Sequence, residues 1–445
     1  MNKDLYWIRS GFFTVLQNLS SVVMAFGTLL LLVRVLSEHD YGTWILYTIT
    51  ATILEIIRSG LVQNALIKYL AASEKEDHKK IISSSFAITA VITAVCIVLI
   101  LSFAGFLGNI WKSPELSVLF PLYCFVFVMS GVTTQFNCII QANLQFKSLL
   151  VGSFLTQFVF FSFVLTSYIF DIKVGPIELL YVQIFNAFLG MGIAYYFVKP
   201  YLFFSMKIYW DWIKRLFNYG KYAFGTSVSA ILSVTIDQMM LGAILSPAAT
   251  ANFNIAVRIT NILDVPTNAV AVIVFPKSAK RMETDGKEAI KYLYEKSVGT
   301  LLALLFPGAL FLYVFAGFIV DMIAPRYSDA VPLLHITLLY CLLTPYGRQF
   351  GNILDSIGKT KITFFIVLIV ATLNIGLNYI FIVNMGVMGA AYATLLSNVI
   401  GTIIGQYILR KELNVNVYNT FIYAFRFYPE FFSKYIRPLR RHYRN

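Results

Sequence analysis

The chain has 445 residues, of which 58% are hydrophobic, 16% are aromatic and only 13% are charged. Such a composition excludes an ordinary soluble domain of this length and indicates a protein that crosses the membrane many times. The formal charge of +13 suggests nucleic acid as a partner. The basic residues follow the membrane loops instead, so no nucleic-acid binding is expected.

Apolar segments of membrane-spanning length recur along the whole chain, and no cleaved signal peptide is expected before the first of them. They predict twelve transmembrane helices near 11–33, 43–66, 82–107, 117–140, 149–170, 177–198, 222–245, 251–275, 298–323, 331–354, 362–383 and 386–409. The outside loops are only a few residues long, and no soluble domain is inserted. The expected fold class is therefore all-α integral membrane.

Lysine and arginine residues are distributed unevenly between the two sides of these predicted helices. The N-terminus, the even-to-odd loops and the C-terminal tail hold 28 of the 35, whereas the odd-to-even loops hold four. The remaining three, Arg58, Arg258 and Arg348, lie inside spans. Because basic residues concentrate on the cytoplasmic side, both termini are expected in the cytoplasm. An odd number of spans would scramble this pattern, which supports twelve.

The basic segment 199–221 divides the spans into six and six. We expect an N-terminal six-helix lobe over 1–198, a cytoplasmic connection over 199–221 and a C-terminal six-helix lobe over 222–410. A basic aromatic cytoplasmic tail follows over 411–445, and its last basic residues are Lys434, Arg437, Arg440, Arg441 and Arg444. This tail is predicted to lie on the anionic cytoplasmic leaflet, with a specific binding partner as the alternative.

The two halves resemble each other weakly. With an offset of 209, Leu36 and Ser37 fall on Leu245 and Ser246, and Glu55 falls on Asp264. Two six-span halves of the same orientation are related by an axis along the membrane normal, and a transport substrate then lies between them near the midplane.

Polar residues gather on one side of the predicted eighth span. At 100° per residue, Asn254, Arg258, Asn261, Asp264 and Asn268 fall within an arc of about 120°. A charged side chain at mid-bilayer costs at least ~2.5 kcal/mol, so this side must face protein or water and not lipid.

The second span carries Glu55 and Arg58 on a similar stripe, the seventh carries Asp237, and the tenth carries Arg348 near its cytoplasmic end. Arginines facing a cavity bind phosphate through forked, charge-assisted hydrogen bonds. The candidate substrate-binding residues are therefore Arg58, Arg258, Arg348, Asn254 and Asn261. The carboxylates Glu55, Asp237 and Asp264 would balance the arginines, or bind a proton or sodium ion whose gradient drives transport. No other cofactor is expected.

The alternative is that these charges pair among themselves and fix helix packing. Glu55 and Arg58, three residues apart on one helix, meet the spacing for such a pair. For Arg58 and Arg258 we favour the substrate-binding interpretation, because both lie near mid-span. For Asn374, Asn378 and Asn398 we favour a packing role, since amide side chains join membrane helices without any transport function.

Neither metal ligation nor catalysis is indicated. The four cysteines, Cys96, Cys124, Cys138 and Cys341, lie singly in apolar segments without the spacing of metal ligands or disulfides. The histidines are scattered, and no nucleophile and base occur together at a recognisable spacing. The chain is therefore not expected to be an enzyme.

Four segments resemble a known family when taken in order along the chain. They are RVLSEHDYGTWIL (34–46), IDQMMLGAILSPAATANFNIAVRI (236–259), DSIGKTK (355–361) and the glycine-rich NIGLNYIFIVNMGVMGAAYATLLS (374–397). They are similar to the corresponding segments of Wzx-type polysaccharide flippases, which share a superfamily with the multidrug and toxic-compound exporters. The chain departs from the common pattern at Asn384, where a proline is frequent.

This resemblance implies a MATE-like bundle of two six-helix lobes around a central cavity. Such proteins move an undecaprenyl-diphosphate-linked oligosaccharide across the bacterial inner membrane by alternating access, for O-antigen, lipopolysaccharide or capsule synthesis. Cations of spans 2 and 8 face the cavity in related flippases, which is where Arg58 and Arg258 stand. The implied partners are the lipid-linked oligosaccharide, membrane lipids and glycan polymerase machinery.

Three alternatives stay open. A cation-coupled multidrug exporter of the same superfamily would favour an acidic, aromatic cavity over one with arginines. A membrane-embedded glycan polymerase or ligase would place catalytic groups in a sizeable outside loop, which this chain lacks. The major-facilitator fold also has twelve spans, but 68–80 lacks the Gly-x-x-x-Asp-Arg pattern of that family.

Overall fold

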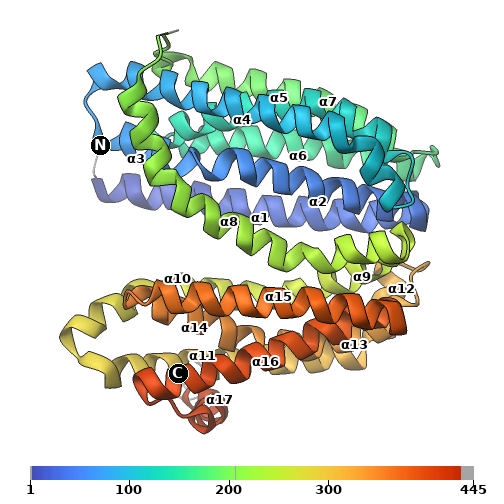
Figure 1. The fold of residues 1–445 in the computed structure, drawn as a ribbon, viewed down its shortest axis with the longest axis vertical. Helices are drawn as coiled ribbons and strands as arrows, with labels where there is room; N and C mark the ends of the chain where they lie inside the picture. Colours follow the sequence, from blue (N-terminus) through green and yellow to red (C-terminus); the bar gives the residue numbers. More distant parts are fainter. Residues whose placement is uncertain (1–2, 206, 432–445) are drawn as a thin grey trace, which may run out of the picture. The chain divides into compact units, whose positions relative to one another are not determined.

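The structure is a computed structural model of the chain, and it describes residues 3–205 and 207–431. Over these residues the chain is helical and contains no strand, which confirms the predicted fold class (Figure 1). Contacts divide it into two compact units, Met1–Ala251 and Asn252–Asn445.

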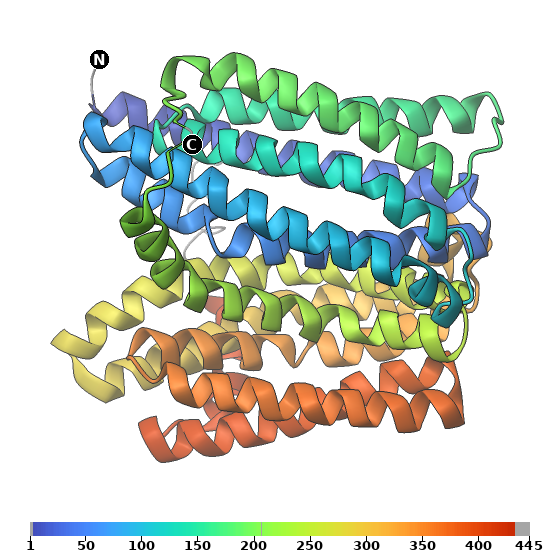
Figure 2. The ribbon, with the colours of Figure 1, turned by 45° about the horizontal axis from the view of Figure 1, so that its top comes forward.

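The first unit holds the helices that correspond to the first seven predicted spans. They are α1 (Lys3–Val35), α2 (Glu38–Gly60), α3 (Gln63–Ala72), α4 (Lys75–Ile110), α5 (Leu116–Ala142), α6 (Phe146–Ile169), α7 (Pro176–Val198), the short 3-10 helix η1 (Lys199–Tyr201), α8 (Trp210–Ile244) and the start of α9 (Pro247–Thr260). Figure 2 shows the helices α1 to α7, coloured from blue to green, as one group that runs in roughly the same line. The second predicted span is interrupted between α2 and α3.

The second unit holds the rest. It contains the remainder of α9, the 3-10 helix η2 (Asn261–Leu263), α10 (Asp264–Thr284), α11 (Gly286–Val314), α12 (Ala316–Ile323), α13 (Ala330–Cys341), α14 (Thr344–Ser356), α15 (Thr360–Met385), α16 (Val387–Leu413) and α17 (Val417–Phe431). The predicted eighth, ninth and tenth spans are each interrupted, at η2, before α12 and before α14.

A helix lies at each of the twelve predicted spans, but they differ in length and apolarity. Within the described ranges, nine helical segments are long and apolar enough to cross a membrane. Ser20–Val35 in α1 and Val234–Ile244 in α8 are shorter apolar helices. The chain is a multi-pass membrane protein, and the count of twelve stays a prediction.

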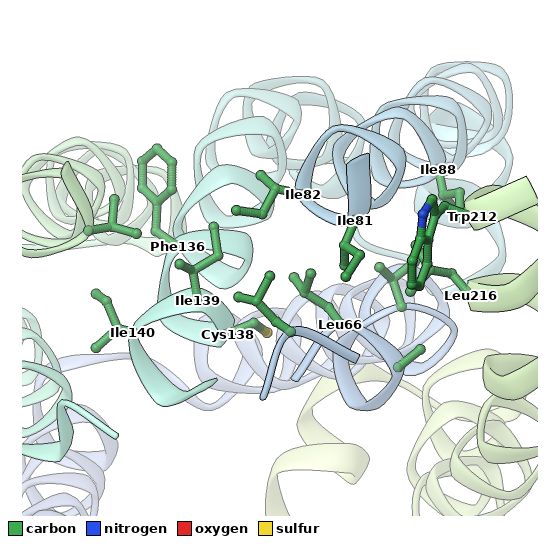
Figure 3. Close-up of a cluster of buried hydrophobic side chains, with 14 of the residues drawn as sticks. Leu66, Ile81, Ile82, Ile88, Phe136, Cys138, Ile139, Ile140, Trp212 and Leu216 are labelled. Atoms are coloured by element: carbon green, nitrogen blue, oxygen red, sulfur yellow. The ribbon is translucent and has the colours of Figure 1, made fainter. Parts of the chain in front are cut away.

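Helix α8, the first helix of the second predicted lobe, packs within the first unit. Its Trp212 and Leu216 join Leu66 of α3, Ile81 of α4 and Ile139 of α5 in one buried hydrophobic cluster (Figure 3). The compact unit therefore extends beyond the basic segment 199–221 and ends inside α9. The lobe boundaries expected from the charge pattern stay a prediction.

Helix α8 and the start of α9 are held against the other helices of the first unit by close backbone contacts. A Cβ atom added at Gly220 of α8 would lie 1.6 Å from the Leu61 carbonyl oxygen. A Cβ atom added at Gly42 of α2 would lie 1.9 Å from the Pro247 carbonyl oxygen. The Trp111 indole donates to the Met239 carbonyl at 3.1 Å, and the Lys112 ammonium donates to the Leu245 carbonyl at 2.8 Å. Glycine is required at both close approaches because any side chain would collide with backbone.

Each unit contains a parallel pair formed by the second and fourth spans of its half. In the first unit, Arg58 of α2 donates a hydrogen bond to the Ser130 hydroxyl of α5, and the Tyr123 hydroxyl of α5 donates one to the Ala51 carbonyl of α2. The two residues of each pair are 72 positions apart in the sequence. In the second unit, hydrogen bonds of 2.6 Å join Thr260 to Thr337 and Ser278 to Ser356, at separations of 77 and 78. A constant separation means that the helices run in the same direction, and its recurrence supports the predicted repeat.

The described start of the predicted tail forms α17, which packs on α11. The buried Glu295 carboxylate accepts hydrogen bonds of 2.8 Å from the Asn416 backbone and the Asn419 amide. The Tyr428 hydroxyl donates to the Ala303 carbonyl at 2.7 Å. The predicted basic residues Lys434, Arg437, Arg440, Arg441 and Arg444 lie outside the described residues.

The close approach of α8 and the α2–α3 turn leads to a test of stability. Alanine is normally favoured over glycine in a helix by about 1 kcal/mol, so Gly→Ala should stabilise wherever there is room. Gly220→Ala should instead lower the unfolding temperature of the purified protein in detergent, because its Cβ would meet the Leu61 carbonyl. Gly192→Ala on α7 is the matched control, since no described atom lies within 4 Å of its Cβ position. An unchanged or raised unfolding temperature for Gly220→Ala would contradict this packing.

Candidate functional site

Arg58 lies in the interior of the first unit, with only 1% of its surface exposed. Its Nη1 donates to the Phe127 carbonyl, and its Nη2 donates to Glu55 and, at 3.2 Å, to the Ser130 hydroxyl. The guanidinium also lies 4.3 Å from the centre of the Phe127 ring, a cation–π distance. Gly131 makes room for it, since a Cβ there would lie 2.8 Å from Nη1. The guanidinium is therefore held by α5 and by its own helix.

Glu55 connects this pair to a wider polar network. Its Oε1 accepts a hydrogen bond from Ser130 at 2.5 Å and one from the Tyr123 hydroxyl at 3.3 Å. The Tyr123 ring packs edge-on against Tyr47 at 5.6 Å, and the Tyr47 hydroxyl donates to Gln183 of α7 at 2.7 Å. About a third of the Glu55 side chain is exposed, so this carboxylate is the accessible end of the network.

Glu55 and Arg58 were predicted as site residues from the sequence, but their partners on other helices were not. On α5, Tyr123, Phe127 and Ser130 are spaced at i, i+4 and i+7, which places them on one face. That spacing was the available signal, and it was weak because each residue type is common in membrane helices. The intrahelical pairing that was the alternative interpretation of Glu55 and Arg58 is present.

The polar stripe of the predicted eighth span divides into buried and exposed residues. Asn254 is buried in α9, whereas Arg258 of α9 and Asn261 of η2 are exposed. Arg258 lies eleven residues into α9 from Pro247, about 16 Å along the helix and thus near mid-span. An exposed guanidinium at this depth must face water or an anionic ligand, because lipid contact is too costly.

Asp264, at the first residue of α10, and Arg348 of α14 interact electrostatically within the second unit. The Asp264 side chain is half-buried, and Arg348 is exposed. By the register of the two parallel segments, Arg348 lies level with residues 270–271 and therefore about 18 Å beyond Arg258 along the helix axis. Within its predicted spans, the described part of the second unit thus presents exposed guanidinium groups at two depths, Arg258 and Arg348, with the Asp264 carboxylate between them.

The remaining predicted residues are placed as follows. Asp237 is buried near the end of α8 in the first unit. Asn374 of α15 donates to the Ser397 hydroxyl of α16 at 3.0 Å, and Asn378 donates to the Asn374 side chain at 3.0 Å. These bonds are the contacts that a packing role requires. In the described part of the chain, His, Cys, Asp and Glu side chains form no group of three able to hold a metal.

The Glu55–Arg58 pair leads to a double-mutant test. Removing one partner of a buried ion pair is strongly destabilising, and residues in direct contact show coupling energies of about 0.5–3 kcal/mol. Arg58→Ala and Glu55→Ala should each lower the unfolding temperature in detergent, and the double variant should lower it by less than the sum of the two single effects. Asp77 and Lys80 form a matched exposed pair, also three residues apart and 2.8 Å between charged atoms, and should show much weaker coupling because water screens both charges. Strict additivity at Glu55 and Arg58 would contradict the pairing.

The chain matches two family models and several solved structures. Residues 31–332 match the sequence model of a family described as polysaccharide biosynthesis protein, and residues 348–428 match that of the lipid II flippase MurJ. Among solved structures, the lipid II flippase MurJ in an inward closed conformation superposes with a TM-score of 0.73 at 15% identity, covering 95% of this chain and 93% of that one. An inward-facing multidrug MATE transporter also gives 0.73 at 15% identity, over 89% and 94%. At such identities the likeness shows the fold alone.

Three sequence relatives are similar to this chain. The lipopolysaccharide biosynthesis protein WzxC of Escherichia coli is 19% identical over 88% of this chain and 78% of its own length. An uncharacterized membrane protein of Methanocaldococcus jannaschii, MJ1068, is 28% identical over 49% of this chain, and Agl15 of Haloferax volcanii, a probable low-salt glycan biosynthesis flippase, is 24% identical over 45%. The chain spans less than half the length of these last two, 42% and 43%. Since the first family match covers more than half of its residues, the chain belongs to the polysaccharide biosynthesis protein family, which confirms the resemblance to Wzx-type flippases.

Proposed function

We propose that this protein flips a lipid-linked oligosaccharide across the bacterial cytoplasmic membrane, with undecaprenyl diphosphate as the lipid carrier. The observation that carries the proposal is the exposed Arg258 guanidinium near mid-span in α9. A permanent cation at that depth is costly unless it meets water or an anion, and the diphosphate of a lipid-linked glycan is such an anion.

Moving a lipid-linked oligosaccharide from one leaflet to the other breaks no covalent bond. A sugar diphosphate is strongly hydrated, so an unaided crossing of the hydrocarbon layer is very slow. A protein accelerates it by giving the sugar polar groups, such as the exposed Asn261, and by giving the diphosphate a cation. Exposing that site to one side of the membrane at a time, by alternating access, then moves the head group across while the lipid tail stays in the bilayer.

Arg258 and Arg348 act in succession in this proposal. Their separation of about 18 Å along the helix axis is larger than a diphosphate, so the two guanidinium groups would contact it at different depths. Asp264 would compete with the substrate for Arg348 and so limit how tightly the diphosphate is held there. Transport requires such moderate binding, because a site that never releases its ligand does not transport it.

Direct substrate contact by Arg58 stays a prediction. In the described conformation its guanidinium is covered by Phe127 and Ser130 and paired with Glu55. To bind a diphosphate, Arg58 would have to exchange these partners for the ligand. Coupling of transport to a proton or sodium gradient through Glu55, Asp237 or Asp264 likewise stays a prediction.

The second candidate function is a cation-coupled multidrug exporter. The observation in its favour is that the MATE transporter structure superposes on this chain with the same TM-score as MurJ, 0.73. The exposed Arg258 and Arg348 inside the predicted spans would repel a cationic drug, whereas they would attract the anionic carrier of a flippase. The names of the sequence relatives, WzxC and Agl15, also concern glycan synthesis and not drug export. A polymerase or ligase is not supported by any of these relatives.

The cytoplasmic placement of both termini belongs to the same proposal. It rests on the excess of lysine and arginine in alternate loops. Fusing a reporter that is active only in the cytoplasm to each terminus of the full chain would test it. Activity from both fusions is expected, and activity from one alone would mean an odd number of spans.

The flipping proposal is tested by deleting the gene in its native host and analysing the lipid-linked sugars. A complete oligosaccharide on undecaprenyl diphosphate should accumulate on the inner leaflet, and surface polymer should be lost. Wild-type protein should restore export, whereas Arg258→Ala should reduce it by about tenfold or more, because a charge-assisted hydrogen bond contributes about 1.5–3 kcal/mol. Arg258→Lys should retain part of the activity if charge suffices and lose it if the forked geometry matters.

Lys277→Ala is the matched control, an exposed cation on α10 beyond the predicted span, and it should leave export unchanged. All variants are compared at equal amounts of folded membrane protein. Unchanged glycans in the deletion strain, combined with altered sensitivity to cationic drugs, would establish the exporter instead.

A further inference from the structure

A cavity of about 420 Å³ lies at one end of α6 and α7, in the first unit. It is lined by polar and aromatic residues from the start of α6 and from the end of α7 with η1, namely Gln145, Ser148, Tyr196, Phe197, Lys199 and Tyr201, together with Pro200. Its volume is within the range of small-ligand sites. None of these residues belongs to the Glu55–Arg58 network, so the cavity is separate from the groups proposed for flipping.

The charge of the lining favours an anion. Lys199 is exposed, the Tyr201 hydroxyl and the Gln145 amide are joined at 3.4 Å, and the Ser148 hydroxyl lies on the first turns of α6. The seven lining residues include no Asp or Glu. Lys147, next to Ser148 in the chain, is a second exposed cation. One ammonium group and several neutral donors suit a phosphate ester.

The position of the cavity favours a lipid as the source of that phosphate. Only 6% of the residues in the apolar window of α6 are fully buried inside the protein, and exposed apolar residues such as Phe154, Leu155 and Phe158 give this helix a side that is open to lipid. On α7, exposed aromatic residues recur at helical spacing at Tyr181, Phe185, Phe188 and Tyr195, and Tyr196 beside them lines the cavity with 76% of its surface exposed. The lipid-facing aromatic side of α7 thus leads directly to the cavity.

The cavity also lies where a membrane helix meets the polar interface. Both α6 and α7 are apolar along their spans, and the cavity is at the ends where Lys147 and Lys199 lie. Lys199 begins the basic segment 199–221. By the distribution of basic residues, these ends face the cytoplasm, whose leaflet carries the anionic lipids. Tyrosine side chains are enriched at this depth, because they combine an apolar ring with a hydroxyl.

We propose that this cavity binds the head group of an anionic phospholipid of the cytoplasmic leaflet, with its acyl chains along the aromatic side of α7. Lys199 neutralises the phosphodiester, and Ser148, Gln145 and Tyr201 donate hydrogen bonds to it. Basic pockets beside transmembrane helices on this side of a membrane are suited to such head groups. The bound lipid would fix the interface between α6, α7 and η1.

The test is lipid titration of the delipidated full-length protein in detergent, followed by native mass spectrometry. Dioleoylphosphatidylglycerol should bind in preference to dioleoylphosphatidylcholine, which has the same chains but no net charge. Lys199→Ala should weaken phosphatidylglycerol binding by about fivefold, equivalent to the ~1 kcal/mol that one lysine contributes near an anionic leaflet. Lys199→Arg should retain the preference.

Lys173→Ala is the matched control, because Lys173 is an exposed lysine in the connection at the opposite ends of the same two helices. It should leave phosphatidylglycerol binding unchanged. Equal binding of the two lipids, or equal losses from Lys199→Ala and Lys173→Ala, would overturn the proposal. Displacement of phosphatidylglycerol by millimolar inorganic phosphate would also overturn it, since the site would then bind free phosphate and not a lipid. Unfolding temperatures of all variants identify a loss that comes from misfolding.

Discussion

Burying the Arg58 guanidinium among apolar helices constrains the side chains around it. A guanidinium carries five N–H donors and cannot release its charge, so the surrounding protein must supply acceptors and a negative charge. Glu55 supplies the charge, the Phe127 carbonyl and the Ser130 hydroxyl accept hydrogen bonds, and Gly131 leaves the space. These requirements fix how α2 lies against α5. The fourth span of the first half is thereby tied to the second.

In the second half, the carboxylate and its arginine come from different helices. Asp264 occupies the position of Glu55 under the offset of 209, but the residue three further on is Thr267, not arginine. Its arginine comes from the other helix of the parallel pair, as Arg348 on α14. Both carboxylates therefore stand beside the fourth span of their own half and near a guanidinium. In the first half that guanidinium is covered by protein, and in the second it is exposed.

This difference separates structural charge from charge that is available to a ligand. A fully hydrogen-bonded guanidinium mainly determines helix packing, whereas an exposed one is free to exchange water for a phosphate. The chain belongs to a family described as polysaccharide biosynthesis protein, and an anionic lipid carrier is the kind of molecule that such a cation recognises. The α6–α7 cavity adds a second anionic contact, with a lipid of the surrounding membrane, at a place where no part of the flipping chemistry is required.

Several properties of the protein follow from the amino-acid sequence alone. Long apolar segments require helices, because only helices satisfy their own backbone in lipid. The family follows from four motifs, and the spacing of Glu55 and Arg58 allowed their pairing as the alternative to substrate binding by Arg58. The sequence could not show that Tyr123, Phe127 and Ser130 complete this site, because they lie about 70 residues away and meet it only when α2 and α5 run in parallel.

Tertiary structure also decided which unit α8 belongs to. The charge pattern divides the chain at 199–221, since that segment is long and basic, but charge reports only the side of the membrane. Contact between helices depends on shape. The absent side chain of Gly220 allows α8 to meet the α2–α3 turn at backbone distance, and that of Gly42 does the same for the start of α9. Likewise, an arginine on a polar stripe looks the same in sequence whether it is covered, as Arg58 is, or exposed, as Arg258 is. Periodicity identifies the polar side of a helix, and only packing determines what covers it.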